Sequence, residues 1–159
     1  MSVILRDSLL GAVRHAFDLI NEFTDRCPDA AWAEKFGGWP IWQQCYHCFA
    51  AVNFFLRQHN DPAGDALFPP AVANLNEVSL ETPSRQTVKE FVLKEQAWVL
   101  RYAQALDDGA LSEKNEGLSE RMGRDMTHAG TLALIASHTM YHLGTCDAAL
   151  RQHGLRGVF

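Results

Sequence analysis

Apolar side chains recur at every third or fourth position from about residue 3 to residue 24, and this period predicts an amphipathic surface helix. Charged and polar side chains occupy the opposite face, where we expect His15 to be exposed. A second helix is predicted over about residues 40–59, after a break at Gly37-Gly38-Trp39-Pro40. It is apolar nearly all round, so we expect it to be buried on more than one side. The apolar stripe of the first helix comprises Leu9, Val13, Ala16, Phe17, Ile20 and Phe23.

Two more helices are predicted over about residues 85–107 and 127–152. Ser84 precedes the first of them and can cap it, because a serine hydroxyl accepts a hydrogen bond from the backbone N–H groups that a helix start leaves free. Residues 60–83 and 108–126 are rich in turn-forming or polar residues and are expected to be long loops. Four helices without a convincing strand pattern predict an all-α fold, a four-helix bundle whose long loops permit a crossover.

The length of 159 residues predicts one domain that spans residues 1–159. Apolar residues make up 47% and charged residues 21%, as in ordinary globular proteins. The net charge of −5 and the lack of a basic block argue against a nucleic-acid partner, because phosphate binding needs clustered cations. The uncharged stretch 36–56 contains Gly, Pro and amide residues, so we expect a buried helix rather than a membrane span. Without a recognisable signal peptide, a cytoplasmic protein with reduced cysteines is expected.

A pair of histidines lies four residues apart in the fourth helix, within Ser-His138-Thr-Met-Tyr-His142-Leu-Gly. Both would lie on one face of the helix, with a rise of about 6 Å between them. They share that face with the buried stripe, and neutral imidazoles in an apolar setting are good ligands for divalent transition metals. Such pairs also occur by chance on helix surfaces, so the pair alone does not establish a metal site.

A third imidazole is available in the second helix, where His47 is followed one turn later by the small residues Ala50 and Ala51. Three His ligands with an open fourth position are typical of a catalytic zinc-type site rather than a closed structural one. However, His47 lies on the lesser apolar stripe, about 160° around the helix from Cys45. Periodicity leaves two interpretations open: His47 completes a metal site, or it is a core histidine bonded to a backbone carbonyl.

The other histidines and the cysteines are expected to be structural. Cys45-Tyr-His-Cys48 has the C-x-x-C spacing of a redox motif, but such motifs follow a strand at the start of a helix, and this one lies within a helix. We expect both cysteines to pack in the core, as free cysteine commonly does. Cys146 is expected in the core as well, and Cys27 in a loop. Structural positions near helix ends are expected for His59, His128 and His153.

Glu95 stands out among the carboxylates because it lies at the centre of the apolar stripe of the third helix, and buried Glu is rare unless paired. Near a metal it could accept an imidazole N–H or act as a general base on a coordinated water. The alternative is a salt-bridged Glu near the end of the bundle. Glu95 and Tyr46 are the candidates for catalytic proton transfer.

Two motifs carry a resemblance to a known family: Trp42-Gln-Gln-Cys-Tyr-His47, followed by Cys-Phe-Ala-Ala-Val-Asn-Phe-Phe-Leu, and His138-Thr-Met-Tyr-His142-Leu-Gly144. The chain resembles the DinB-like (YfiT-like) metalloenzymes over nearly its whole length. This resemblance implies a four-helix bundle, a homodimer, and a divalent metal bound by His47, His138 and His142, with His47 turned inward. Family members often have Arg-Gly-Gln after the last His, where this chain has Leu143-Gly144-Thr145.

The main hypothesis is a metal-dependent enzyme in which the three His bind Zn²⁺, with Ni²⁺ or Fe²⁺ as alternatives, and leave a position for water or a thiol. The reaction would be hydrolysis, or transfer of a low-molecular-weight thiol to a small-molecule substrate, since some relatives of this family transfer such thiols or isomerise small acids with thiol help. Arg57 and Arg101 are the candidates for binding an anionic thiol. One alternative is a non-catalytic metal or small-molecule binding protein with the same ligands. Another is a helical dimerisation protein whose His residues belong only to the core. No nucleic acid or membrane is expected as a partner.

Overall fold

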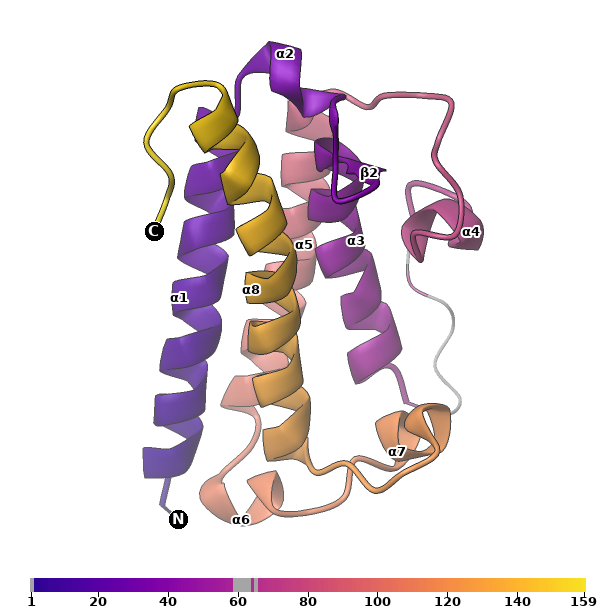
Figure 1. Cartoon of the computed structure of the whole chain (residues 1–159). Coiled ribbons are helices and arrows are strands. Elements are labelled where there is room, and N and C mark those ends of the chain that lie inside the picture. Colours follow the sequence, from indigo (N-terminus) through magenta and orange to yellow (C-terminus); the bar gives the residue numbers. More distant parts are fainter. Residues whose placement is uncertain (1, 59–63, 65) are drawn as a thin grey trace.

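The computed structural model describes residues 2–58, 64 and 66–159, and within these residues four long helices form a bundle (Figure 1). The predicted all-α four-helix bundle is therefore confirmed. α1 packs mainly against α8, and α3 packs against both α5 and α8. The four helices are α1 (Ile4–Arg26), α3 (Ile41–Leu56), α5 (Arg85–Gln104) and α8 (His128–Gln152).

The order of the helices in space includes a crossover. α3 and α5 pack against each other and run in the same direction, since both begin near the top of Figure 1 and end near the bottom. Parallel neighbours need a connection that returns along the bundle, and the segment that contains α4 (Pro70–Ala73) lies in this connection. Because α4 packs beside α3, it can contribute backbone groups to a site on that helix.

A two-stranded hairpin precedes α3, where the sequence predicted only a break. β1 (Lys35–Phe36) and β2 (Trp39–Pro40) pair in antiparallel fashion. The turn between them is Gly37-Gly38, with φ angles of 58° and 94°, and glycine adopts positive φ without the steric cost that other residues have. Strands of two residues are too short to show alternation, which is why the pattern did not reveal them.

The helix ends agree with the predicted capping but not with all of the predicted boundaries. The hydroxyl of Ser84 accepts a hydrogen bond from the backbone N–H of Thr87 at 3.1 Å, so the predicted cap of α5 is confirmed. α3 ends at Leu56 and α5 at Gln104, rather than at about residues 59 and 107. Short helices occupy parts of the remaining connections: α2 (Asp29–Trp32), α6 (Asp108–Leu111) and α7 (Glu116–Met122).

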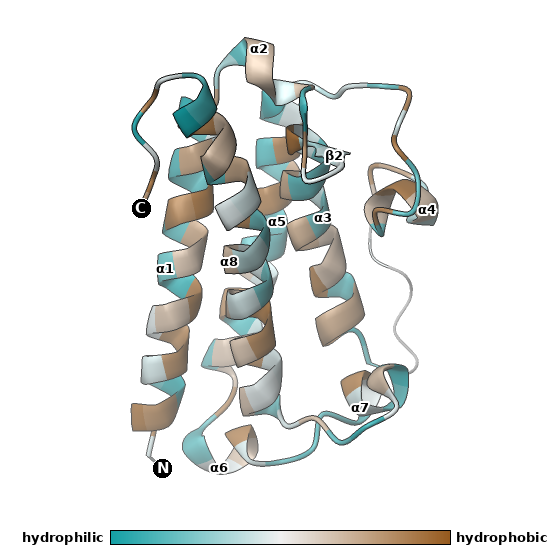
Figure 2. Ribbon diagram, in the orientation of Figure 1, coloured by the Kyte–Doolittle hydropathy of each residue, from teal (hydrophilic) through white to brown (hydrophobic). Residues whose placement is uncertain are grey.

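The hydrophobic core lies between the four long helices, whose apolar residues are brown in Figure 2. The predicted stripe of α1 is buried from Val13 to Phe23, while Leu10 is buried more fully than the predicted Leu9. Most side chains of α3 are buried, in agreement with its all-round apolar character. Within the described part of the chain, none of the helices combines the length and the apolar character that a membrane crossing requires.

Candidate metal centre

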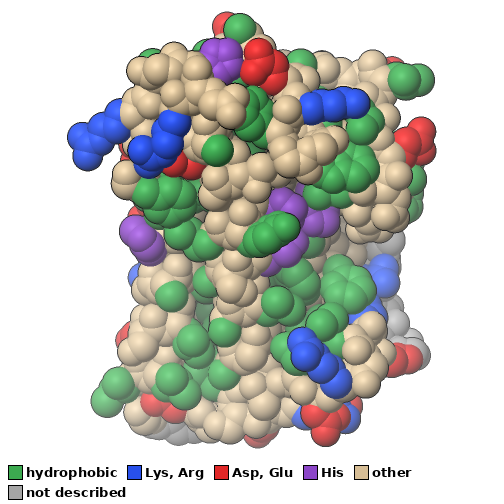
Figure 3. All heavy atoms as spheres, in the orientation of Figure 1, with side chains coloured by type: hydrophobic (Ala, Val, Ile, Leu, Met, Phe, Trp, Pro, Cys, Tyr) green, Lys and Arg blue, Asp and Glu red, His purple; other side chains and the backbone are tan. Residues whose placement is uncertain are grey.

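The three histidines that the sequence singled out meet between α3 and α8. The candidate donor nitrogens of His47, His138 and His142, one from each residue, all lie within 4.8 Å of one another. The ring centroids are 5.0 Å apart for His47 and His138 and 4.8 Å apart for each of the other pairs. Purple side chains near the middle of the face in Figure 3 show that the cluster reaches the surface. Among the described residues, no further His, Cys, Asp or Glu joins this group.

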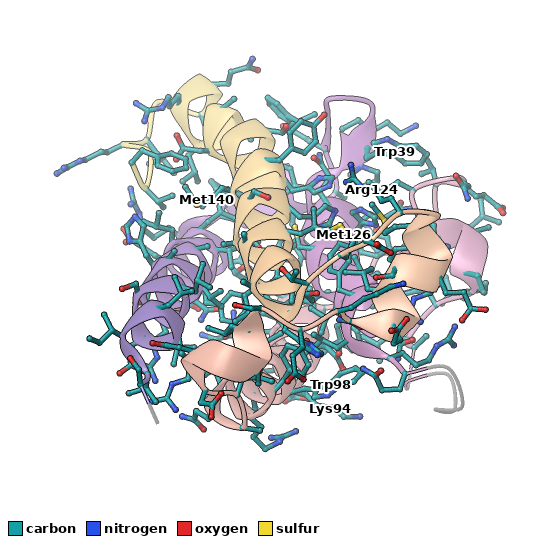
Figure 4. The ribbon with its side chains drawn as sticks, turned by 90° about the horizontal axis from the view of Figure 1, so that it is seen from below. Trp39, Lys94, Trp98, Arg124, Met126 and Met140 are labelled. Carbon is teal, nitrogen blue, oxygen red and sulfur yellow. The ribbon has the colours of Figure 1, made fainter. Side chains whose placement is uncertain are left out.

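The position of the His pair on α8 follows from helix geometry. Met140 projects from the side of α8 that faces α1, as the view from below shows (Figure 4), and it packs against the core. His138 and His142 lie two residues to either side of Met140, about 200° around the helix at 100° per residue. They therefore lie on the side of α8 that faces α3, where His47 is located.

The position of His47 is compatible with both interpretations that the sequence left open. It faces the other two histidines, and its Nδ1 donates a hydrogen bond to the backbone carbonyl of Ala73 at 2.7 Å. Because a carbonyl oxygen only accepts hydrogen bonds, Nδ1 of the neutral ring carries the proton and Nε2 presents a lone pair. A hydrogen bond of this kind, from the far nitrogen of a metal ligand, fixes the tautomer and orients the ring.

The distances and the donor chemistry fit a divalent transition metal. The Nε2 atoms of His47 and His138 lie 3.2 Å apart. Two nitrogens at about 2.0–2.1 Å from a tetrahedral Zn²⁺ would be about 3.3 Å apart, so the separation suits two ligands of one ion. The Nδ1 atoms of His138 and His142 are buried and have no hydrogen-bond partner in the described part of the chain. Three imidazoles form a donor set that such metals prefer.

The protonation state of the cluster also suits metal binding. Burial, followed by the neighbouring His47, lowers the pKa of His138 to about 4. Burial and both neighbouring rings lower the pKa of His142 to about 3. Burial lowers the pKa of His47 as well, against the opposing effect of its bond to Ala73. All three rings are therefore neutral at pH 7, which is the state that binds metals.

Two aromatic side chains that sequence reasoning missed pack against the cluster. The ring centroids of Phe55 and His138 are 5.4 Å apart, and those of Tyr141 and His142 are 5.1 Å apart. Tyr141 is 73% exposed, so it borders the outer side of the cluster. Its only signal in the sequence is its place beside His142, and an exposed helix residue gives no periodicity that would mark it.

Tyr46 and Glu95, the two predicted catalytic residues, line the same pocket of about 290 Å³ between α3, α5 and α4. Both side chains are buried. The phenol oxygen of Tyr46 accepts hydrogen bonds from the backbone N–H groups of Leu67 at 3.1 Å and Phe68 at 3.3 Å. Burial, and more weakly Glu95, raises the pKa of Tyr46. The rest of the described lining is Ala50, Asn53, Phe54, Arg57, Gly64, Ala66, Phe68, Pro70, Ala73, Asn74 and Phe91.

This pocket adjoins the three-histidine cluster without including its side chains. None of the three histidines is among the described lining residues, whereas Ala73, which bonds to His47, is one of them. The structure therefore changes one expectation for Glu95: the acceptor for the imidazole N–H of His47 is the Ala73 carbonyl. Arg57 lines the pocket, as a thiol-binding role would require, but Arg101 is exposed and is not among the described lining residues.

The cysteines and those remaining histidines that the structure describes have the structural settings that were expected. Cys27, Cys45, Cys48 and Cys146 are free and buried. His15 is exposed on α1. His128 begins α8 and forms a hydrogen bond with the hydroxyl of Tyr102 at 2.5 Å. His153 lies 2.9 Å from Glu34. His59, which was expected near the end of a helix, lies outside the described residues.

Comparison with known proteins places the fold and the family. A crystal structure of a DinB-like protein from Bacillus cereus ATCC 10987 is similar to this one, with a TM-score of 0.67 at 18% sequence identity, and the match covers 95% of this chain and 94% of that chain. No curated protein matches the sequence. The sequence profile of the DinB superfamily matches residues 12–146, which include all three histidines of the cluster. This match covers most of the chain, which therefore belongs to the DinB superfamily.

Proposed function

We propose that the protein is a metal-dependent enzyme that acts on a small molecule, either as a hydrolase or as a transferase of a low-molecular-weight thiol. The observation that supports this proposal is the group of three neutral imidazoles, whose donor nitrogens lie within 4.8 Å of one another near the surface. Structural zinc sites usually have four protein ligands, whereas catalytic sites have three and leave a position for water or substrate. We propose Zn²⁺ as the ion, with Ni²⁺ or Fe²⁺ as alternatives.

The residues of the chain would bind the metal ion and orient its ligands. A divalent metal bound by the three His would lower the pKa of a coordinated water or thiol toward neutrality. His47 is held by Ala73 with its Nε2 toward the other rings. His142 is 7% exposed, so bulk water has little access to its ring and competes less for the metal there.

The adjoining pocket is the proposed place for the organic part of the substrate. A volume of about 290 Å³ is near the lower end of small-molecule sites, which favours a compact ligand. Because the oxygen of Tyr46 already accepts two backbone hydrogen bonds, its hydroxyl proton is the group that can be offered to a ligand. Glu95 would accept or deliver a proton, and Arg57 would attract an anionic thiol.

A second candidate is a non-catalytic metal or small-molecule binding protein. It is favoured by the finding that none of the three histidines is among the described residues that line the pocket. In that case the metal centre and the pocket would be two separate features of the bundle. Turnover distinguishes the two candidates, because both require the same metal ligands.

The test uses protein purified without a histidine tag. Metal content is measured by mass spectrometry, and turnover is measured with a panel of thiols plus a chromogenic electrophile and with chromogenic esters. We expect close to one metal ion per chain, turnover that is lost on metal removal, and loss of both in His142→Ala. The control is His15→Ala, which changes an exposed histidine on α1.

Two results would contradict the proposal in different ways. If His142→Ala retained its metal, the three-His site would be wrong. If the wild-type protein bound metal but reacted no faster than the metal-free protein, the enzyme proposal would fail and the binding protein would be the better description.

A further inference from the structure

We propose that Gln43 is a positioning residue of the metal centre, which acts on His47 through the carbonyl of Ala73. This inference rests on the proposed metal site and adds a residue that is neither a ligand nor part of the pocket lining. Gln43 lies one turn before His47 on α3, in the Trp-Gln-Gln-Cys-Tyr-His47 motif. No ligand role explains the buried amides of this motif.

Gln43 is fully buried, and its side-chain amide forms hydrogen bonds with the backbone at both ends of the segment 72–79. Its Nε2 donates hydrogen bonds to the carbonyl of Val72 at 3.0 Å and to that of Glu77 at 2.6 Å. Its Oε1 accepts a hydrogen bond from the backbone N–H of Ser79 at 3.3 Å. Both donors of the amide and one acceptor position are therefore used to hold residues 72–79.

The same segment supplies the hydrogen-bond partner of His47. Gln43 binds the carbonyl of Val72, and His47 binds the next carbonyl, that of Ala73, at 2.7 Å. Residues four apart on a helix lie on one face, so two successive turns of α3 contact two successive carbonyls of α4. A helix of four residues has little stability of its own. The Gln43 amide supplies one hydrogen bond to α4 itself and two to the residues that follow it, Glu77 and Ser79.

The neighbouring Gln44 shows that this role is specific to Gln43. Gln44 is also buried, and its Nε2 donates to the carbonyls of Phe36 at 2.7 Å and Trp39 at 3.2 Å. It therefore holds the β1–β2 hairpin rather than α4. The two adjacent amides fix two different segments, and the segment held by Gln43 is the one that bonds to His47.

Without the Gln43 amide, the Ala73 carbonyl should be less firmly positioned. The Nδ1–H tautomer of His47, which the hydrogen bond to this carbonyl favours, should then no longer predominate. Removing a hydrogen-bond partner that orients a metal ligand typically weakens metal binding about 10–100-fold. Because Gln43 acts through Ala73, we expect about a tenfold loss, at the lower end of that range.

The experiment compares Gln43→Met with Gln96→Met, a matched substitution of a buried glutamine. Gln96 on α5 exchanges two side-chain hydrogen bonds with Asn21, at 3.1 and 3.0 Å, and among the described residues it forms no hydrogen bond with α4. Affinity for Co²⁺ is measured by titration well below the unfolding temperature of both variants, so that differences in stability do not enter. The visible Co²⁺ spectrum reports coordination, and two-bond ¹H–¹⁵N NMR of the metal-free protein reports the tautomer of each histidine.

We expect Gln43→Met to bind Co²⁺ about tenfold more weakly, with a changed spectrum and a mixed tautomer at His47. Gln96→Met should lose stability but retain affinity, spectrum and tautomer. Equal affinities and tautomers in the two variants would overturn the inference. If Gln43→Met does not fold, Gln43→Asn serves the same comparison, because its shorter amide cannot reach Val72 and Glu77 together. Failure of the wild-type protein to bind Co²⁺ would instead refute the metal site, and the inference with it.

Discussion

The Nε2 atoms of His47 and His138 lie 3.2 Å apart, although 91 residues separate the two histidines in the chain. The Nδ1 proton of His47 is committed to Ala73, so a lone pair of His47 faces the ring of His138. In the metal-free protein only an Nε2–H of His138 can satisfy this lone pair, and that tautomer leaves the buried Nδ1 of His138 without a donor. A cation bound between the rings would instead take the lone pairs of both Nε2 atoms, so this contact suits two ligands of one metal ion as well as a histidine pair.

The metal-free protein should lose stability as the pH falls. The pKa of His142 is lowered to about 3 and that of His138 to about 4, whereas an unfolded chain has the ordinary value of 6.5. Below pH 6.5 the unfolded state therefore binds protons that the folded state does not, and the free energy of unfolding decreases as the pH drops toward 4. Urea unfolding in the presence of a chelator, between about pH 7.5 and pH 5, measures this dependence.

The control for this prediction is His142→Ala in the same buffers. Removal of one buried imidazole should make the decrease between neutral and acidic pH shallower. Identical pH dependence in the two proteins would show that His142 does not titrate differently on folding.

Native cysteines should be almost unreactive toward thiol reagents at pH 8. Burial raises the pKa of Cys27 to about 12 and that of Cys48 well above its usual range. A hydrogen bond with Cys45, together with burial, does the same for Cys146. The thiolate is the reactive form, and all four thiols are buried away from the reagent. Ellman's reagent should therefore titrate the four cysteines only after unfolding. Rapid reaction of Cys45 and Cys48 in the native protein would revive the redox interpretation of the C-x-x-C spacing.

The bundle could be predicted because its helices carry strong local signals. The buried stripe of α1 and the Ser84 cap depend on neighbours within one or two turns, and the structure confirms both. The hairpin at Gly37-Gly38 could not be predicted from alternation, since each strand has two residues. Its only signal was the pair of glycines, which the positive φ angles explain.

The sequence singled out the three histidines of the candidate site, but not the residues that hold them in position. His138 and His142 stand out because their spacing places them on one face of a helix. The direction of His47 depends on which helix packs against α3, and its acceptor is a backbone carbonyl at Ala73. Every residue has a carbonyl, so no side-chain pattern can mark this one. Gln43 was likewise visible only as a polar residue in an apolar helix.

Glu95→Gln should separate metal binding from turnover. We expect the metal content to remain unchanged, because the imidazole N–H of His47 bonds to Ala73 rather than to a carboxylate. If Glu95 transfers protons, turnover should fall by about 10²-fold or more, the usual contribution of a general acid or base. The matched control is Glu90→Gln, an exposed carboxylate on the same helix. Unchanged turnover would make Glu95 a packing residue of the pocket.

Two glycine substitutions should change stability in opposite directions, and together they test how the C-terminal segment is held. A Cβ at Gly11 meets nothing within 4 Å, so Gly11→Ala should stabilise α1 by about 0.5–1 kcal/mol. A Cβ at Gly157 would instead overlap the carboxylate of Asp147 and the guanidinium of Arg151. The same carboxylate accepts a hydrogen bond from the backbone N–H of Val158 at 2.6 Å.

Gly157→Ala should therefore push the C-terminal segment away from α8 and lower stability by about 1–3 kcal/mol, as overpacking of a buried position does. The midpoint of thermal unfolding measures both effects, and carboxypeptidase digestion reports release of the segment directly. We expect faster trimming of Gly157→Ala than of the wild-type protein, and no change for Gly11→Ala. If Gly157→Ala were as stable and as resistant as the wild type, the contact between Asp147 and Val158 would not be what holds this segment against the bundle.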